Sequence, residues 1–249
     1  MDTTSGIPGA QTLRRGLAIL RLLAENQEQG LRVADIAALT GFERATAHRL
    51  LTSLVEENFA ERDPDGKLYR LGMEAMRLGL ASMKRAPLID RFRPVMQRIA
   101  RLSGDTTFLI VRQGDWTTCV HREEGPFPVR VFTTEVGSVR PLGIGAAGVV
   151  LLAMLEDEAI DAYLRRNAAV LRKYGRDAAQ LRQAVARVRE LGYSETVNEL
   201  TEGVSGIGAG IPIAQGTFAA ISIGAIASRM DSERRAQLGV QLRDALLAS

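Results

Sequence analysis

The segment FERATAHRLLTSLVEENF, residues 42–59, constrains the fold of this chain more than any other. Its apolar residues recur at helical spacing and form one face of a helix: Ala47, Leu50, Leu51, Leu54 and Val55. A shorter helical stretch, VADIAALTG, precedes it and ends at Gly41, because glycine adopts the left-handed conformation that terminates helices. Two short helices around a glycine turn predict a helix-turn-helix.

The face of the second helix opposite its apolar stripe carries side chains suited to DNA. A guanidinium offers paired donors to guanine or phosphate, and a threonine reaches base edges or the thymine methyl group. The predicted DNA-reading positions are Arg44, Ala45, Thr46, His48, Arg49 and Thr52. The alternative interpretation of these residues is an ordinary helical hairpin with a solvated polar face.

The next segment, FAERDPDGKLYRLG, predicts two short strands around a tight turn, with Pro64 and Gly66 at the turn positions they favour. Its basic residues are predicted phosphate contacts: Arg62, Lys67 and Arg70. Upstream, an apolar stripe predicts an amphipathic helix: Leu13, Leu17, Leu20 and Ala24. Helix, helix-turn-helix and basic hairpin is the order of a winged helix, whose wing touches the DNA backbone or minor groove.

Amino-acid composition narrows the classes of protein to which this chain can belong. The formal net charge is only +3, so a nucleic-acid role must rest on the placement of individual charges. The single cysteine excludes an intramolecular disulfide, and with two histidines it offers at most three zinc ligands, which disfavours a structural zinc; we expect no metal and no cofactor. The chain shows neither a signal peptide nor a long apolar run, which predicts a cytoplasmic protein that does not bind membranes.

A full G-x-G-x-x-G stands at Gly143, Gly145 and Gly148, within PLGIGAAGVVLLAML. A dinucleotide fingerprint leaves a strand, opens a helix and reaches a second parallel strand that ends in an acid. Here Pro141 precedes the glycines and further helix follows them, which disfavours that interpretation. Two others stay open: the glycines let a helix pack closely, or the free N–H groups at the helix start bind a carboxylate or phosphate.

The second half of the chain mixes strand-like and helical segments. Strand-like runs are TTFLIVRQ, WTTCVHRE, VRVFTTEV, GVSGIGAGIPI and TFAAISIGAI, and helices are expected over 89–103, 146–156, 157–167, 177–191 and 231–248. Strands grouped with segregated helices predict an α+β fold with a mainly antiparallel sheet. A helix is also expected over 73–86, with an apolar stripe of Met73, Met76, Leu80 and Met83 that packs on its own domain or on a second subunit.

Residues 11–72 closely resemble the DNA-binding domain of IclR-type bacterial transcriptional regulators, most specifically in ATAHRLLTSL and DPDGKLYRLG. Looser matches in VGSVRPLGIGAAG, VRELGYS and NELTEGVSGIGAGIPI extend the resemblance over residues 11–248. It implies a winged helix-turn-helix domain (1–72), a linker helix (73–86) and a GAF-like effector-binding and oligomerisation domain (87–249). It also implies a homo-dimer or homo-tetramer that binds double-stranded operator DNA.

The resemblance further implies a pocket for a small organic acid or aromatic effector. Carried over by position, its residues are Leu142, Gly145, Ala146, Ala147, Thr196, Val204, Gly206 and Ser222. Many relatives have cysteines where this chain has Ile144 and Gly206, and a lysine where it has Val149. Each difference removes a polar or reactive group, which favours an apolar or aromatic acid over a very small polar one.

Two other functions are weighed against this hypothesis. The second half of the chain could serve only to oligomerise a DNA-binding protein that has no effector. Alternatively, Cys119 and His121 would share one face of a strand and could form a nucleophilic pair. No third group that would orient the histidine is evident, so we expect that the protein is not an enzyme.

Overall fold

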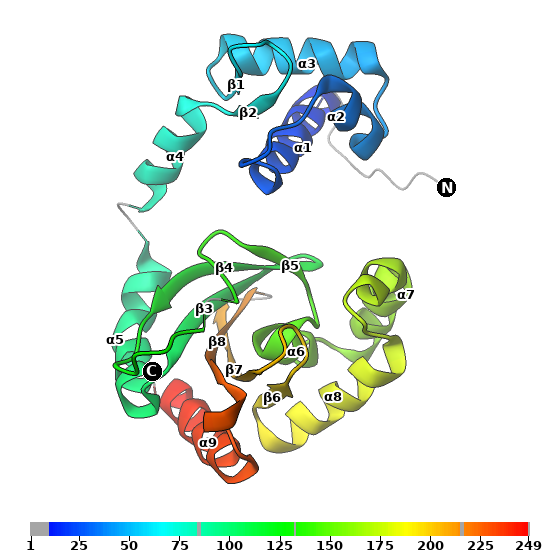
Figure 1. Cartoon of the computed structure of the whole chain (residues 1–249). Coiled ribbons are helices and arrows are strands. Elements are labelled where there is room, and N and C mark those ends of the chain that lie inside the picture. The colour runs from blue at the N-terminus through cyan, green and yellow to red at the C-terminus, as the bar shows by residue number, and fades with distance from the viewer. Residues whose placement is uncertain (1–9, 84–85, 132, 215–216, 249) are drawn as a thin grey trace. The chain divides into compact units, whose positions relative to one another are not determined.

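The computed structural model describes residues 10–83, 86–131, 133–214 and 217–248 (Figure 1). The chain divides into two compact units, residues 1–86 and 87–249. The elements of the first unit are α1 (Gln11–Glu25), α2 (Val33–Thr40), α3 (Arg44–Glu56), β1 (Ala60–Arg62), β2 (Tyr69–Leu71) and α4 (Met73–Met83). Helix, helix-turn-helix and two-stranded hairpin thus follow one another in the predicted order.

A small apolar core holds α1, α2, α3 and the hairpin together. The side chains that are at most 1% exposed in it come from every one of these parts: Ile19, Leu23, Ile36, Ala47, Leu51 and Tyr69. α2 ends at Gly41, whose φ of 72° is readily adopted only by glycine. This turn directs the apolar stripe of α3 into the core and leaves the opposite face of α3 in solvent.

The helix α1 forms as predicted, but its predicted stripe is not the buried face. Leu13 and Leu17 are 65% and 40% exposed, whereas Ile19 and Leu23 fill the core. The apolar residues of α1 lie on more than one side of the helix, and only the side turned towards α3 and β2 is covered. Periodicity identifies the helix, but it does not reveal which of two apolar sides its neighbours cover.

Helix α4 leaves its apolar side chains largely uncovered. It follows β2 directly and contacts β1. Beyond this contact, Met76, Leu78 and Leu80 are 54%, 45% and 57% exposed. The predicted helix over 73–86 ends at Met83 in the structure, and the Met83 side chain and residues 84–85 lie outside the described part of the chain.

The second unit is built on a six-stranded sheet. Its elements are α5 (Pro87–Ser103), β3 (Thr106–Gln113), β4 (Trp116–Glu123), β5 (Val139–Pro141), α6 (Gly145–Ala153), α7 (Asp157–Lys173), α8 (Ala178–Leu191), β6 (Ser194–Val197), β7 (Val204–Ala214), β8 (Thr217–Ile226), a 3-10 turn (Ala227–Arg229) and α9 (Ser232–Leu247). The strand order is β5-β4-β3-β8-β7-β6, and each neighbouring pair is antiparallel. The predicted α+β fold class is confirmed.

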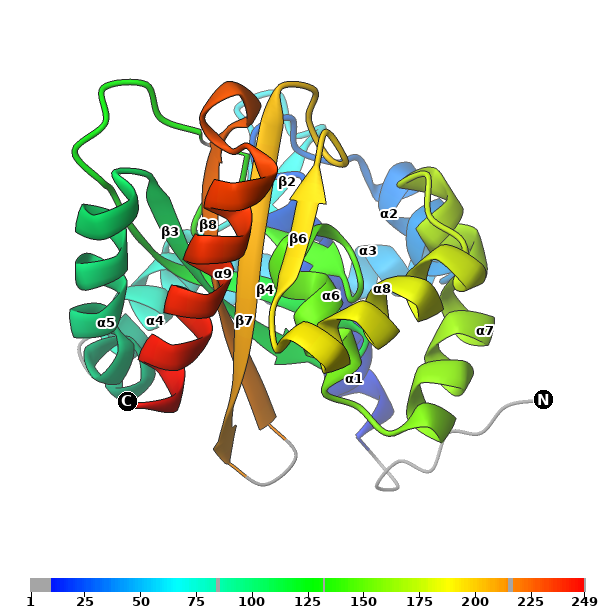
Figure 2. The ribbon, with the colours of Figure 1, turned by 90° about the horizontal axis from the view of Figure 1, so that it is seen from below.

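Helices cover both faces of this sheet (Figure 2). α5 and α9 pack on one face, against Leu109 of β3 and Ile221 of β8. α6 packs on the other face, against Phe108 of β3, and α8 lies against α6. The close approach of α6 requires a glycine in β7, because a Cβ on Gly208 would lie 2.8 Å from the carbonyl carbon of Ala146.

Two details differ from the predicted elements. VRVFTTEV, residues 129–136, is not a strand where the structure describes it. The outer edge of β4 is instead occupied by residues 137–141: Gly137 donates to the Cys119 carbonyl oxygen, and β5 continues the pairing. Conversely, β6 forms at the far edge of the sheet, in a segment for which the sequence predicted no strand. None of the described helices is long and apolar enough to cross a membrane.

Candidate functional site

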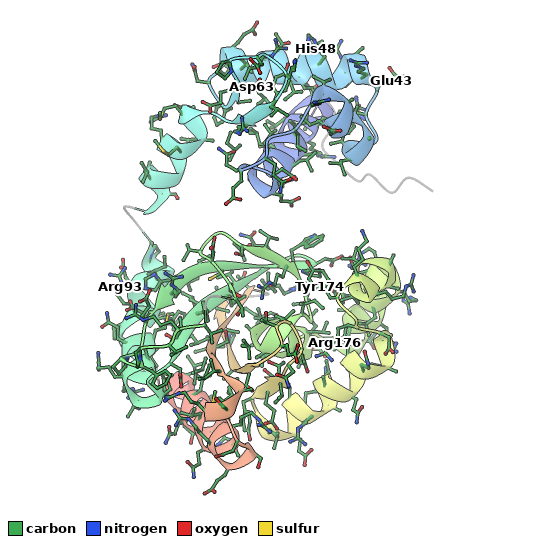
Figure 3. The ribbon with its side chains drawn as sticks, in the orientation of Figure 1. Glu43, His48, Asp63, Arg93, Tyr174 and Arg176 are labelled. Atoms are coloured by element: carbon green, nitrogen blue, oxygen red, sulfur yellow. The ribbon has the colours of Figure 1, made fainter. Side chains whose placement is uncertain are left out.

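The outer face of α3 is polar and open to solvent. Of the predicted DNA-reading residues, Thr46 is half-buried and the others are exposed: Arg44, Ala45, His48, Arg49 and Thr52. Figure 3 shows His48 on the side of α3 turned away from α1. The Thr52 hydroxyl donates to the His48 carbonyl oxygen at 3.0 Å, so it is partly engaged by its own helix.

The arginines of this face are not neutralised by any carboxylate in the described part of the chain. Among the described residues, no carboxylate lies within 4.0 Å of the guanidinium of Arg44 or Arg49, although Arg77 of α4 is paired with Glu74 at 2.5 Å. A guanidinium without an internal partner keeps all its donors for an external anion or base edge. The arrangement therefore suits a polyanion that lies along α3.

The hairpin turn is built around Asp63. Its Oδ1 accepts hydrogen bonds from the backbone N–H groups of Lys67 and Leu68 at 2.7 and 2.9 Å. These hydrogen bonds, above all that from Leu68, lower the pKa of the Asp63 carboxyl below its ordinary value. The ionised carboxylate thus holds the turn closed and presents the exposed Lys67 next to it.

The two arginines of the hairpin are engaged in different ways. Arg62 donates to the Tyr69 hydroxyl and lies 4.8 Å above the centre of the Tyr69 ring. Arg70 is half-buried and donates to the carbonyl oxygens of Glu28 and Gln29 at 3.4 and 3.2 Å. Arg70 therefore fastens the hairpin to the segment that follows α1, and this contact was not foreseen from the sequence.

The second unit contains a cavity on the α6 side of its sheet. Its interior volume is about 80 Å³, several times the roughly 10–15 Å³ that one water molecule requires. The start of α6, strands β3, β4 and β8, and the segments 133–140 and 196–206 form its walls. Apolar side chains contribute much of the lining: Phe108, Ile110, Ile144 and Leu200.

Most of the pocket residues implied by the resemblance lie at this cavity. The lining includes Gly145, Ala146, Ala147, Thr196, Val204, Gly206 and Ser222. Leu142 is fully buried in the core on the α6 side of the sheet and does not line the cavity, and its carbonyl oxygen accepts a hydrogen bond from Tyr163 of α7. The Thr196 hydroxyl donates to the Gly206 carbonyl oxygen at 3.4 Å, so it is part of the wall rather than a free donor.

The glycine turn lets α6 pack closely, and it also lies at the cavity, where the anion-binding role stays a prediction. Gly143 and Gly145 have φ values of 84° and 70°, and Gly148 packs against the backbone of Gly143. α6 begins at Gly145 in the cavity wall, without a side-chain cap. Because β5 pairs antiparallel with β4 and α6 is followed by α7, this is not the strand–helix–parallel strand unit of a dinucleotide site.

Two charged residues of the cavity were missed in the sequence. Arg140 of β5 lines it and donates to the Thr133 carbonyl oxygen. Glu199 also lines it and pairs with Arg176; burial raises the pKa of Glu199 despite that pairing. Two signals were available in the sequence: Arg140 lies next to the glycine turn, and Glu199 lies between the predicted pocket residues Thr196 and Val204.

Cys119 and His121 do not form the pair that strand alternation predicts. A register shift in β4 places Cys119 opposite Ile110 and His121 opposite Leu109, so the two side chains belong to different faces of the sheet. His121 instead contacts Glu123 at 2.8 Å, and Glu123 lies near Arg93 of α5. Burial also raises the pKa of the Cys119 thiol to about 11. Within the described ranges, no three His, Cys, Asp or Glu side chains gather to hold a metal ion.

Comparison with known proteins assigns both units. Residues 12–64 match the model of the IclR helix-turn-helix domain, and residues 80–248 match the model of the bacterial transcriptional regulator IclR C-terminal domain. The chain is 29% identical, over 240 residues, to the HTH-type transcriptional regulator KipR of Bacillus subtilis, covering 95% of this chain and 94% of that protein.

Solved structures show the same fold. An IclR family transcriptional regulator from Brucella abortus superposes with a TM-score of 0.82 at 19% identity, covering 99% of this chain and 96% of the other. An IclR homologue from Microbacterium hydrocarbonoxydans, solved in complex with 4-hydroxybenzoate, has a TM-score of 0.68 at 23% identity over 96% of this chain and all of its own.

Proposed function

The chain belongs to the IclR family of bacterial transcriptional regulators, and from this premise we propose which of its residues bind DNA and which bind an effector. It is a DNA-binding regulator of transcription. In our proposal, residues 1–72 bind the operator, 73–86 form a linker helix, and 87–249 bind the effector and contribute to oligomerisation. A bacterial regulator of transcription binds chromosomal DNA, and this supports the cytoplasmic location that the sequence predicts.

The operator is read by α3. The observation that carries this assignment is the exposed polar face of α3, whose Arg44 and Arg49 have no carboxylate partner within the described part of the chain. Arg49 and His48 lie at the middle of the helix and would face base edges in the major groove, while Lys67 of the hairpin would contact phosphate. Arg62 and Arg70 mainly support the hairpin, and they would contact DNA only at the edge of the interface.

The regulator acts as a dimer or a tetramer. A single small winged helix buries little surface on DNA, so specific affinity requires two heads on a two-fold symmetric site. The uncovered apolar side chains of α4, together with Leu13 and Leu17 of α1, supply a surface for the second subunit. Their exposed fractions, between 40% and 65%, would be costly if they remained in water.

The cavity of the second unit binds a small organic acid or aromatic effector. Its volume, its apolar lining and the uncapped start of α6 support this role, and a homologue of the same fold has been solved with 4-hydroxybenzoate. The rival function, a DNA-binding oligomer without an effector, leaves the cavity without a use. Catalysis by Cys119 is disfavoured, because the thiol is buried and the histidine lies on the other face of the sheet.

Selection from a pool of random duplex DNA tests the DNA-binding proposal. The full chain is expected to enrich a two-fold symmetric site, whereas the variant Arg44→Ala with Arg49→Ala should enrich none.

A thermal-shift screen against aliphatic and aromatic carboxylic acids tests the effector proposal, because binding to the native state raises the melting temperature by mass action. An enriched site without any ligand-induced shift would favour the rival oligomer, and enrichment by the double variant would overturn the assignment of α3.

A further inference from the structure

Arg140 of β5 is a cation in the cavity wall, and it has no acidic partner in the part of the chain that the structure describes. Within the described residues, no carboxylate lies within 4.0 Å of its guanidinium, and its side-chain hydrogen bond goes to the neutral Thr133 carbonyl oxygen. Burial lowers the pKa of Arg140, although the guanidinium remains charged at neutral pH. A cation withheld from water is costly unless an anion or several hydrogen bonds compensate it.

The backbone of β5 aims this side chain at the cavity. Arg140 is paired in register with Thr117 of β4, which also lines the cavity, and the Thr117 hydroxyl donates to the Arg140 carbonyl oxygen at 3.3 Å. The neighbouring Val139 points to the opposite face and is 44% exposed. Alternation along the strand therefore directs Arg140 and Thr117 to the same side.

The other charged side chain in the wall is already paired. Glu199 forms an ion pair with Arg176, which follows α7 (Figure 3), so its negative charge is offset before any ligand enters. Arg140 has no comparable partner among the described residues. As far as these residues show, the cavity wall carries one unmatched positive charge, and a neutral ligand would leave that charge as it is.

The rest of the cavity favours an apolar body on the ligand. Phe108 and Ile110 line one wall. At the start of α6, the Leu200 Cδ1 atom lies 3.0 Å from where a Cβ on Gly145 would stand, so an apolar side chain lies close to this helix end. Across the cavity, the Ser222 hydroxyl is left without a hydrogen-bond partner in the described part of the chain.

We propose that Arg140 binds the carboxylate of the effector, so that the cavity accepts carboxylic acids with an apolar body and rejects their neutral amides. The inference rests on the effector-binding role proposed above and names the residue that sets its specificity. The guanidinium forms two parallel hydrogen bonds to the carboxylate, a geometry that a primary amide does not satisfy.

Isothermal titration of the full chain with matched pairs of an acid and its amide tests this inference. Benzoate with benzamide, and butyrate with butyramide, differ mainly in charge and little in shape. The wild-type protein is expected to bind each acid about 10- to 100-fold more tightly than its amide, as for a hydrogen bond to a charged group. Equal affinity within both pairs would overturn the role of Arg140 and leave the effector cavity itself standing.

Variants then assign the preference to Arg140. Arg140→Gln should abolish the preference for the acid, and Arg140→Lys should retain part of it because the charge remains without the planar fork. Arg101→Gln is the matched control, because Arg101 is exposed on α5, on the other face of the sheet. An unchanged preference in Arg140→Gln would assign the carboxylate to the start of α6 and overturn the proposal. If Arg140→Gln does not fold, the comparison of Arg140→Lys with the wild type on the same acid and amide pairs tests the role of Arg140. A wild-type protein that binds none of the four probes would contradict both this inference and the effector role.

Discussion

Two arginines of the first unit show that the surroundings of a residue decide what it can do. Arg70 gives its guanidinium to the carbonyl oxygens of Glu28 and Gln29, whereas Arg49 is exposed and has no carboxylate partner in the described part of the chain. The sequence predicts both as DNA contacts, because a basic residue in a hairpin does not reveal which carbonyl groups will lie beside it. We expect Arg70 to stabilise the hairpin and Arg49 to bind DNA.

Arg49→Ala is expected to weaken binding to the selected DNA site by about 1–3 kcal/mol and to relax the preference at one base pair, because a base-edge contact is lost. Fluorescence anisotropy at fixed salt, with the selected site and a scrambled duplex, measures both effects. Arg101→Ala, an exposed arginine of the second unit, should bind both duplexes as the wild type does. Equal losses on the two duplexes would assign Arg49 to the phosphate backbone.

The buried Cys119 thiol makes the stability of the second unit depend on alkaline pH. Its pKa is about 11 in the folded chain, while an unfolded thiol ionises near pH 8.5. Above pH of about 8.5 the unfolded chain therefore releases a proton that the folded chain retains, and the free energy of unfolding falls as pH rises towards 11. Urea denaturation from neutral to alkaline pH should show a smaller loss for Cys119→Ala than for the wild type. Identical pH profiles would show that the thiol does not titrate differently in the two states.

The candidate site could be predicted from the sequence only in part, and Cys119, His121 and Arg140 show why. Alternation places the first two on one face, but a single extra residue in β4 turns His121 to the other side, and a bulge leaves no reliable mark in one sequence. Arg140 could not be predicted, because a single arginine beside a glycine turn forms no sequence pattern of its own. Its importance follows from the absence of an acidic neighbour among the described residues, which only the three-dimensional arrangement reveals.

At the scale of elements, the helices and strands whose hydrophobic pattern repeats over many residues were the easiest to predict. α3 and the strands β3, β4 and β8 were predicted with bounds close to those observed, since their hydrophobic periodicity is strong. The segment 129–136 has a similar pattern, yet residues 137–141 occupy the edge of β4 that it would need. Whether a strand-like run becomes a strand depends on an available edge, and that is a property of the whole sheet.

The packing of α6 on β7 yields a prediction for the element it positions. A Cβ on Gly208 would come within 2.8 Å of the Ala146 backbone, so Gly208→Ala must push α6 away from the sheet. We expect a loss of about 1–3 kcal/mol in the free energy of unfolding, measured by urea denaturation, and weaker ligand binding because Ala146 lines the cavity. Gly16→Ala in α1 meets no atom within 4 Å and should be neutral or slightly stabilising. A Gly208→Ala variant as stable as the wild type would show that α6 tolerates the displacement.

At the scale of the whole molecule, regulation requires the effector cavity in residues 87–249 to change how residues 1–86 bind DNA. Such coupling is typically about 1–3 kcal/mol, and it acts in both directions, so operator DNA must change effector affinity by the same factor. The two units meet in sequence at the end of α4, which makes this helix the covalent route between them. In our proposal, its uncovered apolar side chains would both join subunits and transmit the effector signal.

The oligomer predicted from α4 can be tested with charged substitutions. Met76 and Leu80 are 54% and 57% exposed, so Met76→Glu with Leu80→Glu should leave the fold of each unit intact while it disrupts the contact between subunits. Light scattering after size exclusion is expected to show a lower mass, and affinity for a site with two half-sites should fall by about 100-fold or more, because the second head no longer binds intramolecularly. Affinity for a single half-site should change little. Leu247→Glu, which alters a side chain 80% exposed at the end of α9, serves as the control and should keep the wild-type mass. An unchanged mass in the double variant would move the subunit contact away from α4 and would require a different partner for its apolar side chains.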